Sequence, residues 1–259
     1  MLCGKKITDH HTVSFNGTNY YLLECKGGFL LIDAGWVGCY ETFKCKLGGL
    51  GLEVSSIRFI LVTHHHHDHA ALIQRIRNDT DCRLIVHRDE IGYMKAGITH
   101  AVDTRQFNLW LNLLDKVVSP FIKYCYEPIE FREDDVIVDT DDVDISSLTG
   151  ICGSIVHTPG HSRGSISLVL KNGNSFVGDV AMNTLRVFGQ QYRPIEAESY
   201  GDVYRSWARL IEKGARDVYP SHGSGFLVEK LTKTRGISKQ ARIDCFPKDE
   251  RIPCGKGGI

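Results

Sequence analysis

The feature that most constrains this chain is the segment THHHHDH at residues 63–69, which places five imidazoles and one carboxylate within seven residues. An apolar run, residues 57–62, precedes it, and an apolar-periodic run, residues 70–76, follows it. This pattern predicts a loop in which a buried strand ends and a helix begins. Layered α/β folds commonly build ligand sites at such strand ends. The segment is internal and Asp68 interrupts the histidines, so it is not a purification tag. Because histidine and carboxylate side chains at close spacing suit zinc, iron and similar ions, we interpret it as a metal site rather than a solvated polar loop.

The composition is that of an ordinary globular protein of 259 residues. Lysine plus arginine and aspartate plus glutamate are balanced at 31 each, so the zero formal charge gives no general attraction to nucleic acid or to an anionic membrane. The first residues are polar and no apolar run approaches the ~20 residues that span a bilayer, so we expect neither a secretory signal nor a membrane-spanning helix. Nine scattered cysteines without a CxxC pair indicate reduced thiols and predict a cytoplasmic protein.

Apolar periodicity and turn residues predict strands that alternate with helices. The expected strands are a hairpin within 12–34, then 57–62, 83–87, two short strands within 133–144, 154–157, 165–170, 175–179 and 217–219. The expected helices are 38–50, 70–77, 88–96, 103–118 and 202–213. Strand-rich blocks before residue 90 and after residue 150 favour two similar β/α halves packed face to face. We expect one domain over 1–259, with a helical insert at about 90–130 and a polar tail at about 236–259.

The spacing within the histidine segment predicts two groups of ligands. In an extended segment alternate residues face the same side, so His64 and His66 can reach one ion, while Asp68 and His69 point toward a second. A catalytic zinc usually takes three protein ligands, so the chain must supply more. Three further metal-binding side chains follow later strand-like segments: His161, Asp179 and His222. Asp33 also ends a strand-like segment, where it either caps the next segment or holds a histidine ligand.

Together these residues resemble the metallo-β-lactamase superfamily. The pattern His64-x-His66-x-Asp68-His69 is followed in order by the three later ligands, and two flanking segments, LLIDAG at 30–35 and TPGHS at 158–162, match motifs of that superfamily. The resemblance spans residues ~20 to 223. It implies an α/β fold, the four-layer αβ/βα sandwich, with the metal site at the edge of the two sheets.

The resemblance also assigns the ligands. It implies that His64, His66 and His161 hold a first metal, that Asp68, His69 and His222 hold a second, and that Asp179 bridges both. An aspartate at the bridging position, where the best-known zinc β-lactamases have cysteine, points to the hydrolase branch with glyoxalase II and the lactonases. A histidine at position 66, where flavodiiron proteins carry glutamate, argues against a redox di-iron role. We expect His65, His67 and His157 to lie near the ligands or to be exposed, not to bind metal.

The mechanism follows from two cations that share a water and lower its pKa from about 15.7 toward about 7. We expect a bridging hydroxide to attack an electrophilic carbonyl or phosphorus, and Asp68 to orient this nucleophile and shuttle a proton. We therefore expect a dinuclear hydrolase of a carboxylic ester, lactone or thioester. The alternatives are a phosphodiesterase on the same scaffold, which the neutral charge disfavours for nucleic acid, and a non-catalytic metal-binding protein. Zinc is the first choice of metal, with iron or manganese as alternatives.

The expected partner is a small-molecule substrate, and three residues after Asp179 are candidates to contact it: Arg186, Tyr192 and Arg193. An arginine near the metals can pair with a substrate carboxylate or phosphate, although an ordinary solvated loop would have the same composition. The helical insert at about 90–130 is a candidate lid. The sequence leaves the oligomeric state open.

Overall fold

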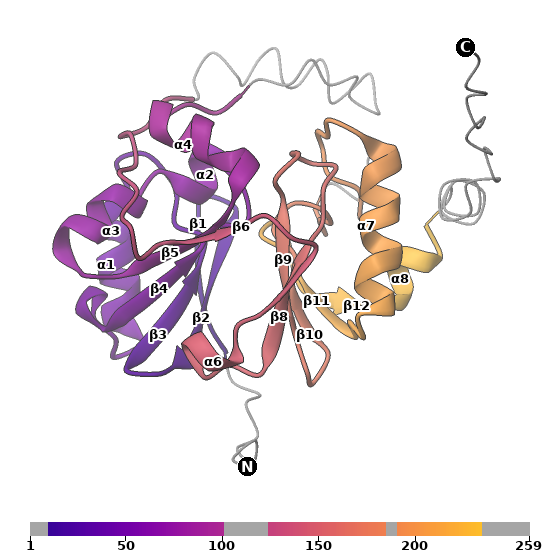
Figure 1. Ribbon diagram of the computed structural model, residues 1–259, viewed down its shortest axis with the longest axis horizontal. Coiled ribbons are helices and arrows are strands. Elements are labelled where there is room, and N and C mark those ends of the chain that lie inside the picture. Colours follow the sequence, from indigo (N-terminus) through magenta and orange to yellow (C-terminus); the bar gives the residue numbers. More distant parts are fainter. Residues whose placement is uncertain (1–9, 101–123, 185–190, 235–259) are drawn as a thin grey trace, which may run out of the picture.

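Two six-stranded sheets pack face to face in the computed structural model, which describes residues 10–100, 124–184 and 191–234 (Figure 1). In spatial order, the first sheet contains β1 (His10–Phe15), β2 (Thr18–Cys25), β3 (Gly28–Ile32), β4 (Ile57–Leu61), β5 (Arg83–His87) and β6 (Val136–Val138). The second runs in the reverse order, from β12 (Phe226–Leu227) through β11 (Asp217–Tyr219), β10 (Asn174–Phe176), β9 (Ile166–Leu170) and β8 (Gly153–His157) to β7 (Asp142–Asp144).

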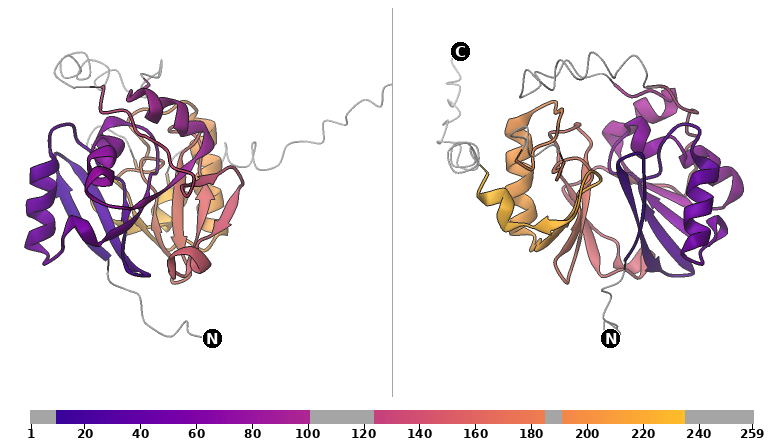
Figure 2. Two further views of the ribbon diagram at one scale, coloured as in Figure 1. Left: turned by 60° about the vertical axis from the view of Figure 1, so that its left-hand side comes forward. Right: turned by 180° about the vertical axis from the view of Figure 1, so that it is seen from behind.

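Helices cover the outer faces of the two sheets. Helices α1 (Tyr40–Gly49) and α3 (Ile73–Asp79) lie outside the first sheet, and α7 (Tyr200–Glu212) and α8 (Glu229–Thr232) lie outside the second (Figures 1 and 2). The shorter helices are α2 (His67–Ala70), α4 (Ile91–Ala96) and α6 (Ser146–Thr149), with 3₁₀ turns at Val54–Ser56 and Arg88–Glu90. Within the three described ranges, no helix is both long and apolar enough to cross a membrane.

The strand residues alternate between two kinds of neighbour, as a pleated sheet requires. In the first sheet, one set faces the helices and joins their apolar residues in a core that includes Leu22, Leu31, Phe43 and Ile73. The other set faces the second sheet in a middle core that includes Leu23, Leu30, Ile155 and Leu168. A third core between the second sheet and α7 includes Val156, Val203, Trp207 and Leu210. Three cores separate four layers, so the predicted αβ/βα sandwich is confirmed.

The elements differ from the predicted ones at two informative places. The helix expected at 70–77 starts earlier and is broken into α2 and α3, because Ala34 of the neighbouring loop intervenes. The Ala34 amide donates to the carbonyl of His69 at 2.6 Å, and the Ala34 carbonyl accepts from the amide of Leu72 at 2.8 Å. The two short strands expected within 133–144 exist but belong to different sheets, because β6 pairs with β5 and β7 pairs with β8.

Part of the predicted domain organisation lies outside the described residues. The expected helix at 103–118 and the tail at about 236–259 fall there, and α4 represents the first part of the expected insert.

Candidate metal centre

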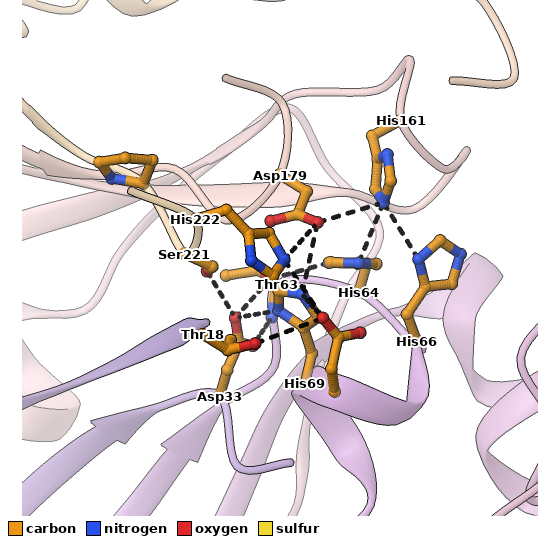
Figure 3. A network of polar contacts seen from close by, with 12 residues as sticks. Thr18, Asp33, Thr63, His64, His66, His69, His161, Asp179, Ser221 and His222 are labelled. Atoms are coloured by element: carbon orange, nitrogen blue, oxygen red, sulfur yellow. Dashed lines mark hydrogen bonds and ion pairs between the residues drawn. The ribbon is translucent and has the colours of Figure 1, made fainter. Parts of the chain in front are cut away.

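The ends of strands from both sheets bring all seven predicted ligand positions together (Figure 3). Three groups of candidate ligand atoms each lie within 4.8 Å of one another: His64 with His66 and His161, His64 with His69 and Asp179, and Asp68 with His69 and His222. Four of these residues come from the loop and short helix after β4, and the others come from loops of the second sheet. The shared members link the three groups into one centre.

The first triad consists of three imidazoles, His64, His66 and His161. His161 Nε2 lies 3.1 Å from both His64 Nε2 and His66 Nδ1. The other ring nitrogen of His161, Nδ1, lies 2.7 Å from the carbonyl of Glu196 and donates to it, which leaves Nε2 as a lone pair aimed at the other two rings. Burial and then neighbouring imidazoles lower the pKa of His64 and of His66 well below the usual value. Imidazole nitrogens that converge in this way form a cation-binding donor set.

The second triad combines the carboxylate of Asp68 with the imidazoles of His69 and His222, and Asp179 lies between it and the first. His222 Nε2 lies 3.2 Å from Oδ2 of both Asp68 and Asp179, and His69 Nε2 lies 3.4 Å from the same two atoms. Asp179 Oδ2 is also 3.7 Å from His161 Nε2, so this one carboxylate reaches both triads.

Protons balance the charge of these carboxylates in the metal-free site. Burial raises the pKa of Asp179, but the charges of His222 and His69 outweigh burial and hold it well below its usual value. Burial lowers the pKa of His222, but the carboxylates of Asp179 and Asp68 raise it overall to about 10. The pKa of His69 is likewise raised, because Asp68 and Asp179 outweigh its burial. A bound cation would take the place of these protons.

Asp33 holds histidines of both triads from behind. It is fully buried, and its backbone adopts a left-handed conformation (φ 59°) at the end of β3. Its carboxylate accepts from His69 Nδ1 at 2.8 Å, and from the amide and hydroxyl of Thr63 at 2.7 Å each. Because the Thr63 hydroxyl proton points to Asp33, its oxygen can accept from His64 Nδ1, 3.0 Å away. Of the two interpretations that the sequence left open, the structure shows the one in which Asp33 holds a histidine.

Asp68 is fixed by residues that the sequence did not reveal. The Tyr20 hydroxyl donates to its backbone carbonyl at 3.1 Å, and the Thr18 hydroxyl donates to Oδ2 at 3.5 Å. Trp36 Nε1 in turn donates to the Thr18 oxygen at 3.0 Å. A Cβ at Gly35 would lie 2.0 Å from the Asp68 carbonyl carbon, so only glycine lets the two loops pack this closely. These contacts leave the Asp68 carboxylate directed toward His69 and His222.

The donor set fits a divalent metal on two observations. Asp179 Oδ1 is buried, and among the described residues it has no hydrogen-bond partner. An unpartnered buried polar atom costs about 1–3 kcal/mol, so such atoms at the focus of a site indicate an absent partner. Imidazole nitrogens and carboxylate oxygens are the donors that zinc, iron and manganese accept in proteins.

The predicted substrate contacts are not part of this cluster in the described structure. Tyr192 is buried and its ring packs on Phe226, with the ring centres 4.4 Å apart. Arg193 is also buried, and its Nε donates to the Tyr204 hydroxyl at 2.7 Å. Both side chains therefore support the packing of β12 and α7, and a direct contact with substrate stays a prediction. Arg186 lies outside the described residues.

The histidines expected not to bind metal are placed differently from one another. His157 is half-buried and stacks on His87, with ring centres 4.2 Å apart and planes 6° apart. His65 and His67 are both buried, so exposure does not apply to them. His65 contacts Glu90, a buried carboxylate that sequence reasoning missed. No spacing rule marks Glu90, because it follows β5 as one acid among several.

Comparison with known proteins agrees with this geometry. The family model described as the metallo-beta-lactamase superfamily matches residues 13–222. A beta-lactamase-like protein 2 homolog from Drosophila melanogaster is 26% identical over 217 residues, which cover 82% of this chain and 60% of that protein. A probable metallo-hydrolase from Methanocaldococcus jannaschii is 26% identical over 213 residues, which cover 80% of this chain and 87% of the relative. The chain thus spans less than two thirds of the Drosophila protein's length.

Solved structures show the same fold at lower sequence identity. A metallo-beta-lactamase family protein from Thermus thermophilus has a TM-score of 0.59 at 19% identity, and the match covers 92% of this chain and 78% of that one. The metallo-beta-lactamase MIM-1 from Novosphingobium pentaromativorans has a TM-score of 0.58 at 19% identity, covering 91% and 84%. The matched family model covers most of the chain, and the His/Asp centre lies inside the matched region. This chain belongs to the metallo-β-lactamase superfamily.

Proposed function

We propose that this protein is a dinuclear metal-dependent hydrolase of a carboxylic ester, lactone or thioester. The observation that carries the proposal is the position of Asp179, whose Oδ2 lies 3.2–3.7 Å from ring nitrogens of His222, His69 and His161. One carboxylate within reach of both triads is the arrangement expected of a bridging ligand. A single-metal or purely structural site has no need of it.

The chain's own residues divide the binding of the two ions. His64, His66 and His161 would hold the first, Asp68, His69 and His222 the second, and Asp179 both. Zinc is the first choice because the first triad is entirely imidazole, with iron or manganese as alternatives. When bound, such ions lower the pKa of a coordinated water and stabilise developing negative charge on the substrate.

The protein supplies orientation and proton transfer around the ions. Asp68 is assigned as the proton acceptor and donor of the reaction, since its carboxylate is fixed by Thr18 and faces the same space as Asp179. Asp33 holds the rings of His69 and, through Thr63, of His64. Six of the seven ligands are buried and His222 is partly buried, which strengthens these electrostatic contacts. An aspartate at position 179 favours the ester- and lactone-cleaving branch over the β-lactamases, which makes β-lactams a minor option.

Elemental analysis together with a substrate panel tests the proposal. The panel contains p-nitrophenyl esters, homoserine lactones, thioesters and bis-p-nitrophenyl phosphate. We expect two metal ions per chain and turnover of at least one carbonyl substrate. Asp179→Ala should lose both the metal and the turnover. Asp139→Asn is the control and should retain them, because Asp139 is a half-exposed acid paired with Arg88. Full activity without detectable metal would refute the proposal. Preference for the phosphodiester would favour a phosphodiesterase, and no turnover of any substrate by a metal-loaded protein would favour a metal-binding role.

A further inference from the structure

Glu90 is a buried carboxylate that belongs to neither metal triad. It ends the 3₁₀ turn Arg88–Glu90 after β5, and only 1% of its surface is exposed. Its Oε2 accepts from the backbone amide of His65 at 2.8 Å and also contacts His65 Nδ1. Its Oε1 accepts from the Ser162 hydroxyl and from the Gly164 amide, each at 2.8 Å. These four contacts satisfy the buried charge of Glu90 and fix the position of its carboxylate.

The two oxygens of Glu90 hold the two loops that carry the first triad. His65 lies between His64 and His66 in the loop after β4, in the first sheet. Ser162 directly follows His161 in the loop after β8, in the second sheet. One carboxylate therefore joins the loops that must meet for the three imidazoles to converge. Together with the hydrogen bond from the Ile166 amide to the Thr63 carbonyl at 3.0 Å, it supports the 3.1 Å spacing of His161 to His64 and His66.

The contacts of His65 fix it as a structural partner of Glu90. With its Nδ1 proton donated to Glu90, its Nε2 is free to accept from the His100 amide, 3.2 Å away. Its ring stacks on Tyr93, with the centres 4.3 Å apart and the planes 20° apart. Its carbonyl accepts from the Tyr126 hydroxyl at 2.7 Å. Both ring nitrogens are used in these contacts, so His65 transmits the position of Glu90 to its neighbours and does not bind metal.

The packing on the other side of Glu90 is equally close. A Cβ at Gly164 would lie 2.5 Å from Glu90 Oε1, so a larger residue there would displace the carboxylate or the loop. The Ser162 hydroxyl also contacts the Ser165 hydroxyl at 2.8 Å, which limits its rotation. The loop after His161 is thus held to Glu90 through both a side chain and the backbone.

We propose that Glu90, acting through His65 on one side and through Ser162 and Gly164 on the other, is a positioning residue for the first metal triad. The inference rests on the proposed function, because it concerns the geometry with which His64, His66 and His161 bind an ion. Residues that hold metal ligands from outside the coordination sphere change metal affinity by about 10- to 100-fold when mutated. Glu90 acts on the loops rather than on a ligand ring.

The substitution Glu90→Gln tests the proposal with little change in volume. Whichever way the new amide turns, its NH₂ group faces N–H or O–H donors of one loop, so one of the two loops loses its acceptor. We expect cobalt(II) to bind the first triad about 10- to 100-fold more weakly in a chelator competition. We also expect the visible absorption of the cobalt-loaded protein to change. Asp89→Asn is the matched control, because Asp89 is adjacent but half exposed, and it should behave as the wild type.

Nuclear magnetic resonance supplies a readout that needs neither metal nor activity. In the metal-free protein the His65 Nδ1 proton should give a downfield signal, since it is buried and shared with a carboxylate. The signal should move upfield or disappear in Glu90→Gln, because an amide oxygen is a weaker acceptor than a carboxylate, and it should be unchanged in Asp89→Asn. A role limited to fold stability predicts a different outcome, in which Glu90→Gln unfolds more readily but the folded protein keeps the wild-type cobalt affinity and spectrum.

Substitutions at His65 keep the test decisive if Glu90→Gln does not fold. His65→Asn retains an N–H donor near the position of Nδ1 and should largely keep cobalt affinity, whereas His65→Phe keeps the stacking on Tyr93 but loses the donor and should match the loss expected for Glu90→Gln. If Glu90→Gln or His65→Phe folds and keeps the wild-type cobalt affinity and spectrum, the inference about Glu90 is overturned while the proposed function stands. A wild-type protein that binds no cobalt would overturn the proposed function, and this inference with it.

Discussion

The two halves of the proposed metal centre are built from different chemistry. The first half is three imidazoles, of which His64 and His66 have a lowered pKa and stay neutral. The second half places His69 and His222, whose pKa is raised, against the carboxylates of Asp68 and Asp179. In the metal-free protein the first half therefore contains two neutral imidazoles, His64 and His66, and the second is a proton-filled network of ion pairs. A cation can enter the first half directly, but it must displace protons from the second.

The two buried carboxylates that hold the ligands in place, Asp33 and Glu90, also act in different ways. Asp33 touches ligand rings, because it accepts from His69 Nδ1 and reaches His64 through Thr63. Glu90 touches no ligand ring and instead fixes the loops on either side of the first triad. We infer that Asp33 sets which ring nitrogen faces the metal, whereas Glu90 sets how close the rings come. Substitutions at Asp33 and Glu90 can test whether these two roles are separate.

The largest effect is expected from Asp179→Ala, which removes the carboxylate common to both halves. Metal content and activity should fall together, and by more than the roughly 10- to 100-fold that residues behind the ligands contribute. His66→Ala should also reduce both, but it removes a ligand of the first half only, so one ion per chain should persist. Elemental analysis after dialysis against a fixed free zinc concentration checks this. Equal loss of both ions in the two variants would show that the halves are not separable.

Asp33→Asn is expected to have the next largest effect. An amide that accepts from the Thr63 backbone places its NH₂ group against His69 Nδ1, two donors facing each other. His69 would then shift its proton to Nε2, which faces the site, and lose its metal-binding lone pair. Zinc affinity should fall about 10- to 100-fold.

The half of the centre that loses zinc affinity distinguishes Asp33→Asn from Glu90→Gln. We expect Asp33→Asn to weaken the second half and, through Thr63, also the first, whereas Glu90→Gln should weaken the first alone. Stepwise zinc titration with a competing chelator measures the two affinities. Loss confined to the first half in Asp33→Asn would contradict the assignment of Asp33 to His69.

The two halves also predict opposite pH dependence for the metal-free protein. His64 and His66 have a pKa lowered from 6.5, so the unfolded chain binds more protons and stability falls as the pH drops below 6.5. The pKa of His222 is raised to about 10, so its contribution is complete below pH 6.5 and is lost as the pH rises toward 10. The free energy of unfolding should therefore be greatest near pH 6.5.

Denaturant unfolding between pH 5 and 10 measures this profile, and two changes should alter its alkaline side. His222→Ala removes the group with the raised pKa, and saturating zinc displaces its proton. Either change should flatten the decline above pH 6.5. An unaltered alkaline decline in His222→Ala would assign that slope to other groups, such as His69.

The sequence predicted the parts of the centre that local patterns encode. Strand ends and the spacing of residues 64–69 located the ligands because alternate positions in an extended loop share a side and because parallel strands end at one sheet edge. Glu90 was not predictable, because its partners Ser162 and Gly164 lie 72 and 74 residues away in the other sheet. The break between α2 and α3 was missed for the same reason, since Ala34 makes the hydrogen bonds that interrupt the helix. Long-range hydrogen bonds leave no periodic trace in a sequence.

The smallest effect is expected from Thr18→Val, which tests how finely Asp68 is positioned. Thr18 is fully buried, donates to Asp68 Oδ2 at 3.5 Å and accepts from Trp36 Nε1 at 3.0 Å. Valine keeps the shape but removes the hydroxyl, and a hydrogen bond as long as 3.5 Å contributes about 1 kcal/mol, or roughly fivefold in a rate. We expect kcat to fall about fivefold with the content of both metals unchanged, because Asp33 and Glu90 still hold the ligands. Trp36→Phe, which leaves the Thr18 hydroxyl in place, is the control. If Thr18→Val instead released the second metal, the position of Asp68 would depend on Thr18 for metal binding rather than for proton transfer, and the two halves would differ less than proposed.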